Sequence, residues 1–70
     1  MKQIGDVIVF TDEVGVRHNA LVTNVWSETC LNLVYMDSDV DKTDSYGRQI
    51  VRKTSVQAKM PTSAPGFFWE

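Results

Sequence analysis

The 70-residue chain has little of what small domains use as internal cross-links, because it contains one cysteine, Cys30, and one histidine, His18. A lone cysteine cannot form an internal disulfide, and one Cys with one His is too few for a structural zinc ion, which takes four N or S ligands. A chain of this length buries only about 60% of its unfolded surface. We therefore expect one small domain of modest stability that gains further burial by associating with copies of itself.

Long apolar runs and an excess of positive charge are also missing. No stretch approaches the roughly 18 apolar residues of a membrane-spanning helix, and residues 1–6 lack the apolar run of a signal peptide. The formal net charge is −2 and the sequence pI is about 5.2. Binding to duplex nucleic acid needs a surplus of Lys and Arg on one face. The composition therefore argues against a duplex-DNA binder and against a membrane protein.

Motifs for catalysis and metal binding are absent as well. No Gly-rich phosphate loop occurs, no serine or cysteine has a motif that would activate it, and His18 has no triad partners in the sequence. Alternate Asp residues in the stretch 37–44 match the start of an EF-hand calcium loop. However, Lys42 stands where that loop needs Gly, and Arg48 stands where it needs Glu. We expect no enzyme activity, no cofactor, no metal site and an inert Cys30.

What is present is a series of short β-branched and aromatic runs bounded by turn residues. This pattern predicts strands at residues 7–10, 16–27, 30–36 and 49–56, a polar connection at 37–47 and one helical turn at 57–60. Within residues 16–27 the apolar side changes midway, which indicates a bulge or a strong bend. No window supports a helix of three turns. The prediction is an all-β fold, a small barrel of four to five antiparallel strands.

The C-terminal residues 61–70 form a tail that contains Pro, Gly and aromatic residues and follows the barrel of residues 1–60. Its two prolines lack the N–H donor and cannot continue a strand ladder. Three adjacent aromatics, Phe67, Phe68 and Trp69, cannot all face inward from one strand, because neighbours point to opposite sides. Two alternatives follow, a final strand on the chain's own barrel or a segment that docks on a neighbouring subunit.

The strand order, with a short helical turn near residues 55–57 and a final strand, resembles the SH3-like barrels. The segments NALVT (19–23), LNLVY (31–35), DSYGRQI (44–50) and PGFFW (65–69) also resemble those of short uncharacterised proteins encoded by tailed bacteriophages. The first resemblance implies binding more than catalysis, since this fold hosts many unrelated functions. The second implies a viral protein in the cytoplasm of the host cell.

Residues 44–53 are the first candidate binding segment. Strand alternation puts Tyr46, Arg48, Ile50 and Arg52 on one side, and an inward-facing Ile50 would leave the two arginines at the barrel rim. The guanidinium fork binds phosphate or carboxylate, and the Tyr46 ring can stack. This combination suits a small anion with an aromatic base. The alternative is that Tyr46 closes one barrel end while the arginines pair with the carboxylates of residues 37–44.

A second group consists of Arg17, His18 and Trp26. His18 fits either a ligand contact or a hydrogen-bonded strand histidine, and Trp26 suits core or rim. Together the two groups predict a non-enzymatic, phage-type binding protein that forms homo-oligomers. It would sequester a small anionic, nucleotide-like ligand, such as an immune signal of the host. The alternative is a structural, decoration or adaptor protein of the virion, and the net charge counts against a third reading, single-stranded nucleic-acid binding.

Overall fold

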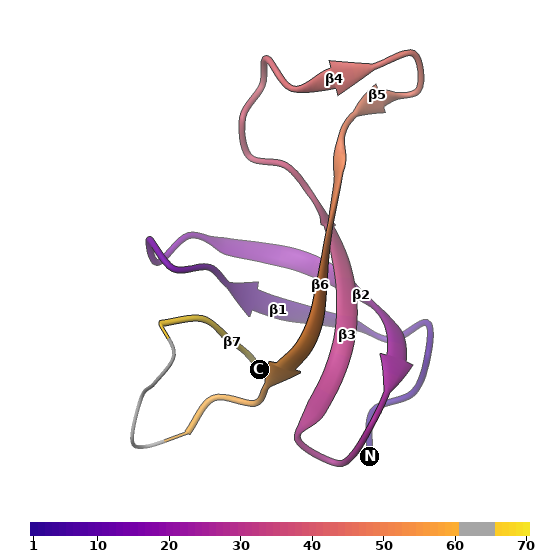
Figure 1. Ribbon diagram of the computed structural model, residues 1–70, viewed down its shortest axis with the longest axis vertical. Helices are drawn as coiled ribbons and strands as arrows, with labels where there is room; N and C mark the ends of the chain where they lie inside the picture. Colours follow the sequence, from indigo (N-terminus) through magenta and orange to yellow (C-terminus); the bar gives the residue numbers. More distant parts are fainter. Residues whose placement is uncertain (61–65) are drawn as a thin grey trace.

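The computed structural model describes residues 1–60 and 66–70, and none of these residues is helical. Within them no helix has the length and apolarity to cross a bilayer. The strands are β1 (Val7–Thr11), β2 (Arg17–Val25), β3 (Cys30–Met36), β4 (Thr43–Asp44), β5 (Gly47–Arg48), β6 (Ile50–Gln57) and β7 (Phe68–Trp69). Five of them form an antiparallel sheet in the order β6-β3-β2-β1-β7, and β4 and β5 form a separate hairpin. The sheet curls into a half-barrel (Figure 1), which confirms the predicted all-β fold and is compatible with a small SH3-like barrel.

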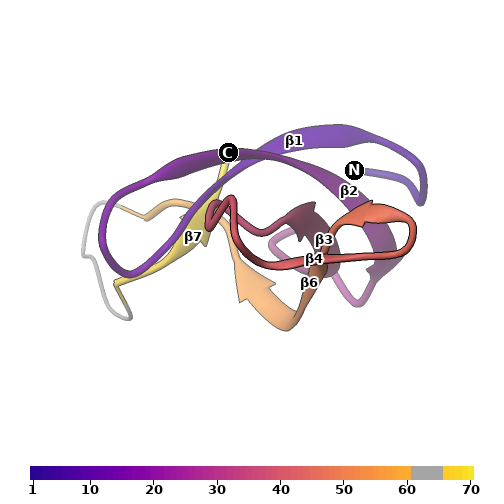
Figure 2. The same ribbon diagram turned by 90° about the horizontal axis from the view of Figure 1, so that it is seen from above.

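The concave face of this sheet holds the core. Alternation along the strands places one apolar set inward, because successive side chains point to opposite faces. The buried residues are Ile8, Phe10, Ala20, Val22, Leu31, Leu33, Val56 and Trp69. Figure 2 shows the curl of β1 and β2 over the other strands, so the opposite face of the sheet is convex and open to solvent.

Two irregularities bend the strands. The register of β2 against β3 shifts between Val22 and Asn24, which confirms the bulge predicted from the change of apolar side. A second register shift, of β3 against β6, lies between the pairs Leu31–Val56 and Leu33–Lys53. At that point Ser55 has a φ of 56°, a left-handed conformation that is uncommon for residues other than glycine. The second bulge was not predicted.

The predicted helical turn at residues 57–60 is wrong. β6 continues through Gln57, the Ala58 N–H donates to the Thr29 carbonyl at 2.8 Å, and the Lys59 N–H donates to the Trp69 carbonyl at 2.8 Å. These donors are used between strands, so they cannot serve a local turn. The contacts close one end of the half-barrel.

The described part of the tail is a final strand. Phe68 and Trp69 pair with Thr11 and Phe10 of β1, and the Trp69 side chain is buried in the core. Its indole Nε1 donates to the Thr29 carbonyl at 3.0 Å. Phe67 is half-buried, with its ring centroid 6.2 Å from that of Phe10. Of the two alternatives, the described part of the tail adopts the strand on its own sheet. The rest of the tail, residues 61–65, lies outside the described ranges. Docking on a second chain stays a prediction.

Residues 37–49, called the arm below, include the polar connection predicted at 37–47 and contain the β4–β5 hairpin, which was not predicted. The arm projects beyond the sheet (Figure 1). Side-chain oxygens of its aspartates accept backbone N–H groups two residues further on, as for Asp44 and the Tyr46 N–H at 2.8 Å. These Asx turns favour compact loops. Gly47, with a φ of 115°, takes a conformation that suits glycine alone.

Candidate functional site

Arg52 lies on the convex face, where the register of β6 fixes its direction. It pairs with Val34, which in turn pairs with Leu21 of β2, and cross-strand partners share a face. The rim position depended on an inward-facing Ile50, and this condition is not met, because Ile50 is 57% exposed and pairs with the exposed Met36. The arginine therefore stands on the outer wall of the half-barrel and not at its rim.

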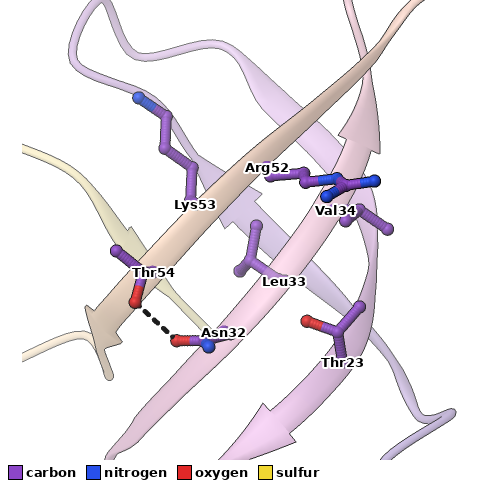
Figure 3. A pocket seen from close by; sticks show the side chains of 7 residues that line it. All are labelled: Thr23, Asn32, Leu33, Val34, Arg52, Lys53 and Thr54. Carbon is purple, nitrogen blue, oxygen red and sulfur yellow. Dashed lines mark hydrogen bonds between the residues drawn. The ribbon is translucent and has the colours of Figure 1, made fainter.

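An open depression of about 460 Å³ surrounds Arg52 on this face (Figure 3). It is lined by Thr23, Asn32, Leu33, Val34, Arg52, Lys53 and Thr54. Figure 3 shows Arg52 reaching from β6 across β3 toward Val34, whereas Lys53 points away on the other side of β6. Lys53 is held there by Glu13, with 3.6 Å between Nζ and Oε1. Among the described residues no carboxylate lies within ion-pair distance of the Arg52 guanidinium.

Asn32 organises the end of the depression nearest the β6 bulge. Its Oδ1 accepts hydrogen bonds from Trp26 Nε1, Thr54 Oγ1 and the Ser55 N–H, each at 2.9 Å. All the acceptor capacity of the amide is thereby used, and its Nδ2 makes no hydrogen bond within the described part of the chain. The donor end of Asn32 remains free for a ligand in the same depression as Arg52.

Trp26 is 61% exposed and lies beside Asn32 through that hydrogen bond. The prediction left Trp26 between core and rim, and the structure places it on the surface. An exposed indole ring held at one edge can serve as a stacking surface for a flat ligand. Asn32 lines the depression together with Arg52, and Trp26 adjoins that depression through its hydrogen bond to Asn32 without lining it.

The other predicted residues lie elsewhere. Arg48 Nη1 donates to the Asp37 carbonyl at 2.9 Å, and Arg48 and His18 both line a separate depression of about 250 Å³. Tyr46 stands near the end of the arm and is 98% exposed, so it closes no barrel end. Arg17 Nη2 lies 3.6 Å from Glu70 Oε1. No ion pair within residues 1–60 and 66–70 joins Arg48 or Arg52 to a carboxylate of residues 37–44, which removes the alternative of local charge pairing.

His18 faces the concave side, and its side chain is 8% exposed. Its Nε2 lies 2.8 Å from Asp12 Oδ2, and its ring centroid lies 4.3 Å from that of Tyr35. Burial by itself raises the pKa of the Asp12 carboxyl. The hydrogen bonds from His18 and from the N–H groups of Val16 and Val14, together with the charge of His18, lower this pKa overall below its ordinary value of 3.8. Burial, followed by the charges of nearby carboxylates, raises the pKa of Tyr35.

The side chains around Arg52 and His18 supply hydrogen-bond donors and acceptors. In the described ranges no three His, Cys, Asp or Glu side chains gather as metal ligands would. The His18–Asp12 pair has no nucleophile hydrogen-bonded to it among the described residues. Sequence reasoning missed Thr23, Asn32 and Thr54. These three are polar residues on the solvent-facing side of strands. Every solvent-facing strand position can carry such a residue, so the pattern does not single them out.

Comparisons of the chain with protein-family models, with curated proteins and with solved structures return no match.

Proposed function

We propose that the protein is a non-enzymatic binding protein that takes a small anionic ligand on the convex face, in the depression around Arg52. One observation carries this proposal. The Arg52 guanidinium has no carboxylate partner among the described residues and shares its depression with Asn32, whose amide N–H groups are free. A guanidinium fork binds phosphate or carboxylate through paired hydrogen bonds.

The exposed Trp26 ring favours a ligand that also carries a flat ring. A nucleotide meets both requirements, with its phosphate at Arg52 and its base against Trp26. Binding alone would serve to sequester such a molecule, for instance an immune signal of a bacterial host attacked by a phage. Sequestration requires no catalytic group.

Isothermal titration at tens of micromolar protein tests the proposal with pyrophosphate, adenosine, a mononucleotide and a cyclic dinucleotide. We expect heat from a nucleotide and a Kd at least about tenfold higher for Arg52→Ala, because a charge-assisted pair is lost. Arg17→Ala is the matched control, since Arg17 already faces Glu70. If none of these compounds gives heat, or if both variants lose binding equally, the site is not the one proposed.

A structural or adaptor role is the second candidate function. The convex face exposes a row of paired apolar side chains, with Val7 69% and Leu21 43% exposed. Arg and Trp, which also lie on this face, are common at the centres of protein interfaces. One variant, Leu21→Ser, distinguishes the two candidate functions. Leu21→Ser should leave nucleotide binding intact, and it should weaken a protein contact made through this row.

A further inference from the structure

The arm and the strand that follows it form a ribbon with limbs of opposite charge. The outgoing limb, residues 37–44, carries four Asp and one Lys. The returning limb, residues 45–53, carries no acid and three cations, Arg48, Arg52 and Lys53. The change of sign falls at the tight turn between β4 and β5.

These charges do not neutralise each other within the chain. Arg48 bonds the backbone carbonyl of Asp37 and not its carboxylate. Lys53 forms an ion pair with Glu13, which lies in the loop between β1 and β2. Within the described ranges, none of the ion pairs links one limb to the other. An acidic row and a cation therefore stand side by side on a projecting segment, each open to a partner of the opposite sign.

Large apolar side chains on the same ribbon are exposed. Met36 and Ile50 form a cross-strand pair at the base of the arm and are 63% and 57% exposed. Further out, Val40 is 67% and Tyr46 is 98% exposed. These four are among twelve large apolar side chains that the described residues expose, and on the ribbon they alternate with charged residues, a combination of types that protein interfaces use.

The surface area of the chain points the same way. A compact monomer of 7.9 kDa exposes about 4,400 Å². This chain exposes 4932 Å², an excess of roughly 500 Å² over that expectation. Its radius of gyration of 12.2 Å also exceeds the value of about 11 Å for a globular chain of this length. A standard interface buries about 800 Å² on each partner, so pairing with a second copy would cover an area larger than this excess.

We propose that two copies of this chain pair through their arms about a twofold axis. The acidic limb of each copy lies against Arg48 of the other, and Met36, Val40, Tyr46 and Ile50 meet at the centre. Twofold symmetry makes both contacts at once, because a surface that is acidic on one limb and basic on the other complements itself. Pairing edge to edge through β6 is disfavoured, since Arg52 and Lys53 of the two copies would face each other. The Arg52 depression stays open, so this proposal does not rest on the proposed function.

Sedimentation equilibrium over a range of protein and salt concentrations tests the pairing. We expect a mass of twice 7.9 kDa and a dimer that weakens with salt, because screening shortens the reach of exposed charges. Asp41→Lys should raise the dimer Kd about tenfold or more, since two symmetric contacts become repulsive. Asp41 makes no side-chain hydrogen bond with the described residues, so its replacement spares the fold. Glu28→Lys, an equal charge change away from the arm, should leave the Kd unchanged.

Tyr46→Ala removes apolar contact without touching charge, and it should weaken the dimer, whereas Ile4→Ala at a distant exposed position should not. The decisive measurement mixes two charge-reversed chains. D41K chains alone and R48E chains alone should be monomers at concentrations where the wild type is a dimer. A mixture of the two should form heterodimers at those concentrations, because every contact across the twofold axis is again between opposite charges. A monomeric wild type at hundreds of micromolar overturns the proposal. So does an oligomer that ignores both arm variants, or a mixture that stays monomeric.

Discussion

The indole Nε1 of Trp26 donates a hydrogen bond of 2.9 Å to Oδ1 of Asn32. The same oxygen accepts from Thr54 Oγ1 and from the Ser55 N–H, so one amide ties an exposed aromatic ring to the bulge of β6. A single acceptor on β3, Asn32 Oδ1, therefore bonds the Trp26 ring and the β6 bulge at one end of the depression. The stability of the fold and the shape of the candidate site therefore depend on the same side chain.

Replacing Asn32 by Ala should lower the free energy of unfolding by about 1–2 kcal/mol, because the three donors must turn to water. Asn19→Ala is the matched control, since Asn19 is exposed on the same face and should change stability by less than about 0.5 kcal/mol. Urea denaturation followed by circular dichroism measures both. Equal effects at the two positions would show that the Asn32 bonds do not hold the bulge.

Ser55 tests the strain at the bulge directly. At its φ of 56°, a β-branched residue is disfavoured, so Ser55→Val should cost about 1–2 kcal/mol. Ser55→Gly should be neutral or slightly stabilising, because glycine adopts this conformation without a steric penalty. The order Gly, Ser, Val in midpoint of thermal unfolding is the expected result. A valine variant as stable as wild type would mean that β6 passes this point in an ordinary extended conformation.

Asp12 should make the fold sensitive to acid. Its pKa in the folded chain lies below the ordinary value of 3.8, so the folded state binds this proton less readily than the unfolded chain does. The resulting stabilisation is fully present above about pH 4 and is lost as the pH falls through the folded pKa. Asp12→Asn should lower stability at pH 7 and reduce the loss between pH 5 and pH 2. Asp41→Asn, at an exposed position, should leave that pH profile unchanged.

The sequence predicted the fold class more accurately than the position of the candidate site, for physical reasons. The run of β-branched and aromatic residues at 7–10 predicted β1, and alternation predicted β3. The change of apolar side midway through residues 16–27 predicted a bulge or bend in β2, because burial acts on each side chain individually. The sequence did not reveal which side chains of β6 face the core, and Ile50 lies on the exposed side. This orientation depends on how Gln49, whose N–H bonds the Lys42 carbonyl, joins the arm to the strand. That hydrogen bond links residues through a loop, and no local pattern records it.

The candidate site shows the same limit. Arg52 and Trp26 were identified from their chemistry, but Tyr46 and Arg48, which are close in sequence to Arg52, lie on the arm and not beside the depression. Asn32 was passed over because its role comes from the strands on either side of it. Sequence proximity gave the residue types, and strand register decided which of them meet.

Trp69 and Phe68 should differ sharply in cost although they are adjacent. Trp69 is buried and hydrogen-bonded to Thr29, so Trp69→Ala should cost about 3–5 kcal/mol, which is close to the whole stability of a domain this small. Phe68 is half-buried with Lys59 Nζ at 5.5 Å from its ring centroid. Phe68→Ala should therefore leave a folded domain. Far-ultraviolet circular dichroism of the two variants at 25 °C distinguishes them, and equal losses would contradict the register of β7.

Fluorescence can separate the candidate site from the core, because the two tryptophans have opposite environments. Trp26 is 61% exposed, and Trp69 is 7% exposed. Trp69→Phe keeps most of the buried ring and loses the hydrogen bond to Thr29, so it should cost only about 1 kcal/mol and leave Trp26 as the sole indole.

In that variant, emission should lie at the longer wavelengths of a solvated indole, and a nucleotide should change its intensity in a saturable way. Adenosine and pyrophosphate, which each supply half of the ligand, should bind at least about tenfold more weakly, because each uses only the ring or only the guanidinium. Arg52→Ala in the same background should shift the response to nucleotide concentrations at least about tenfold higher, whereas Asp41→Lys, which acts at the arm, should not. A nucleotide that leaves Trp26 emission unchanged while giving heat in titration would place the ligand away from this ring. That result would contradict the proposed site on the convex face.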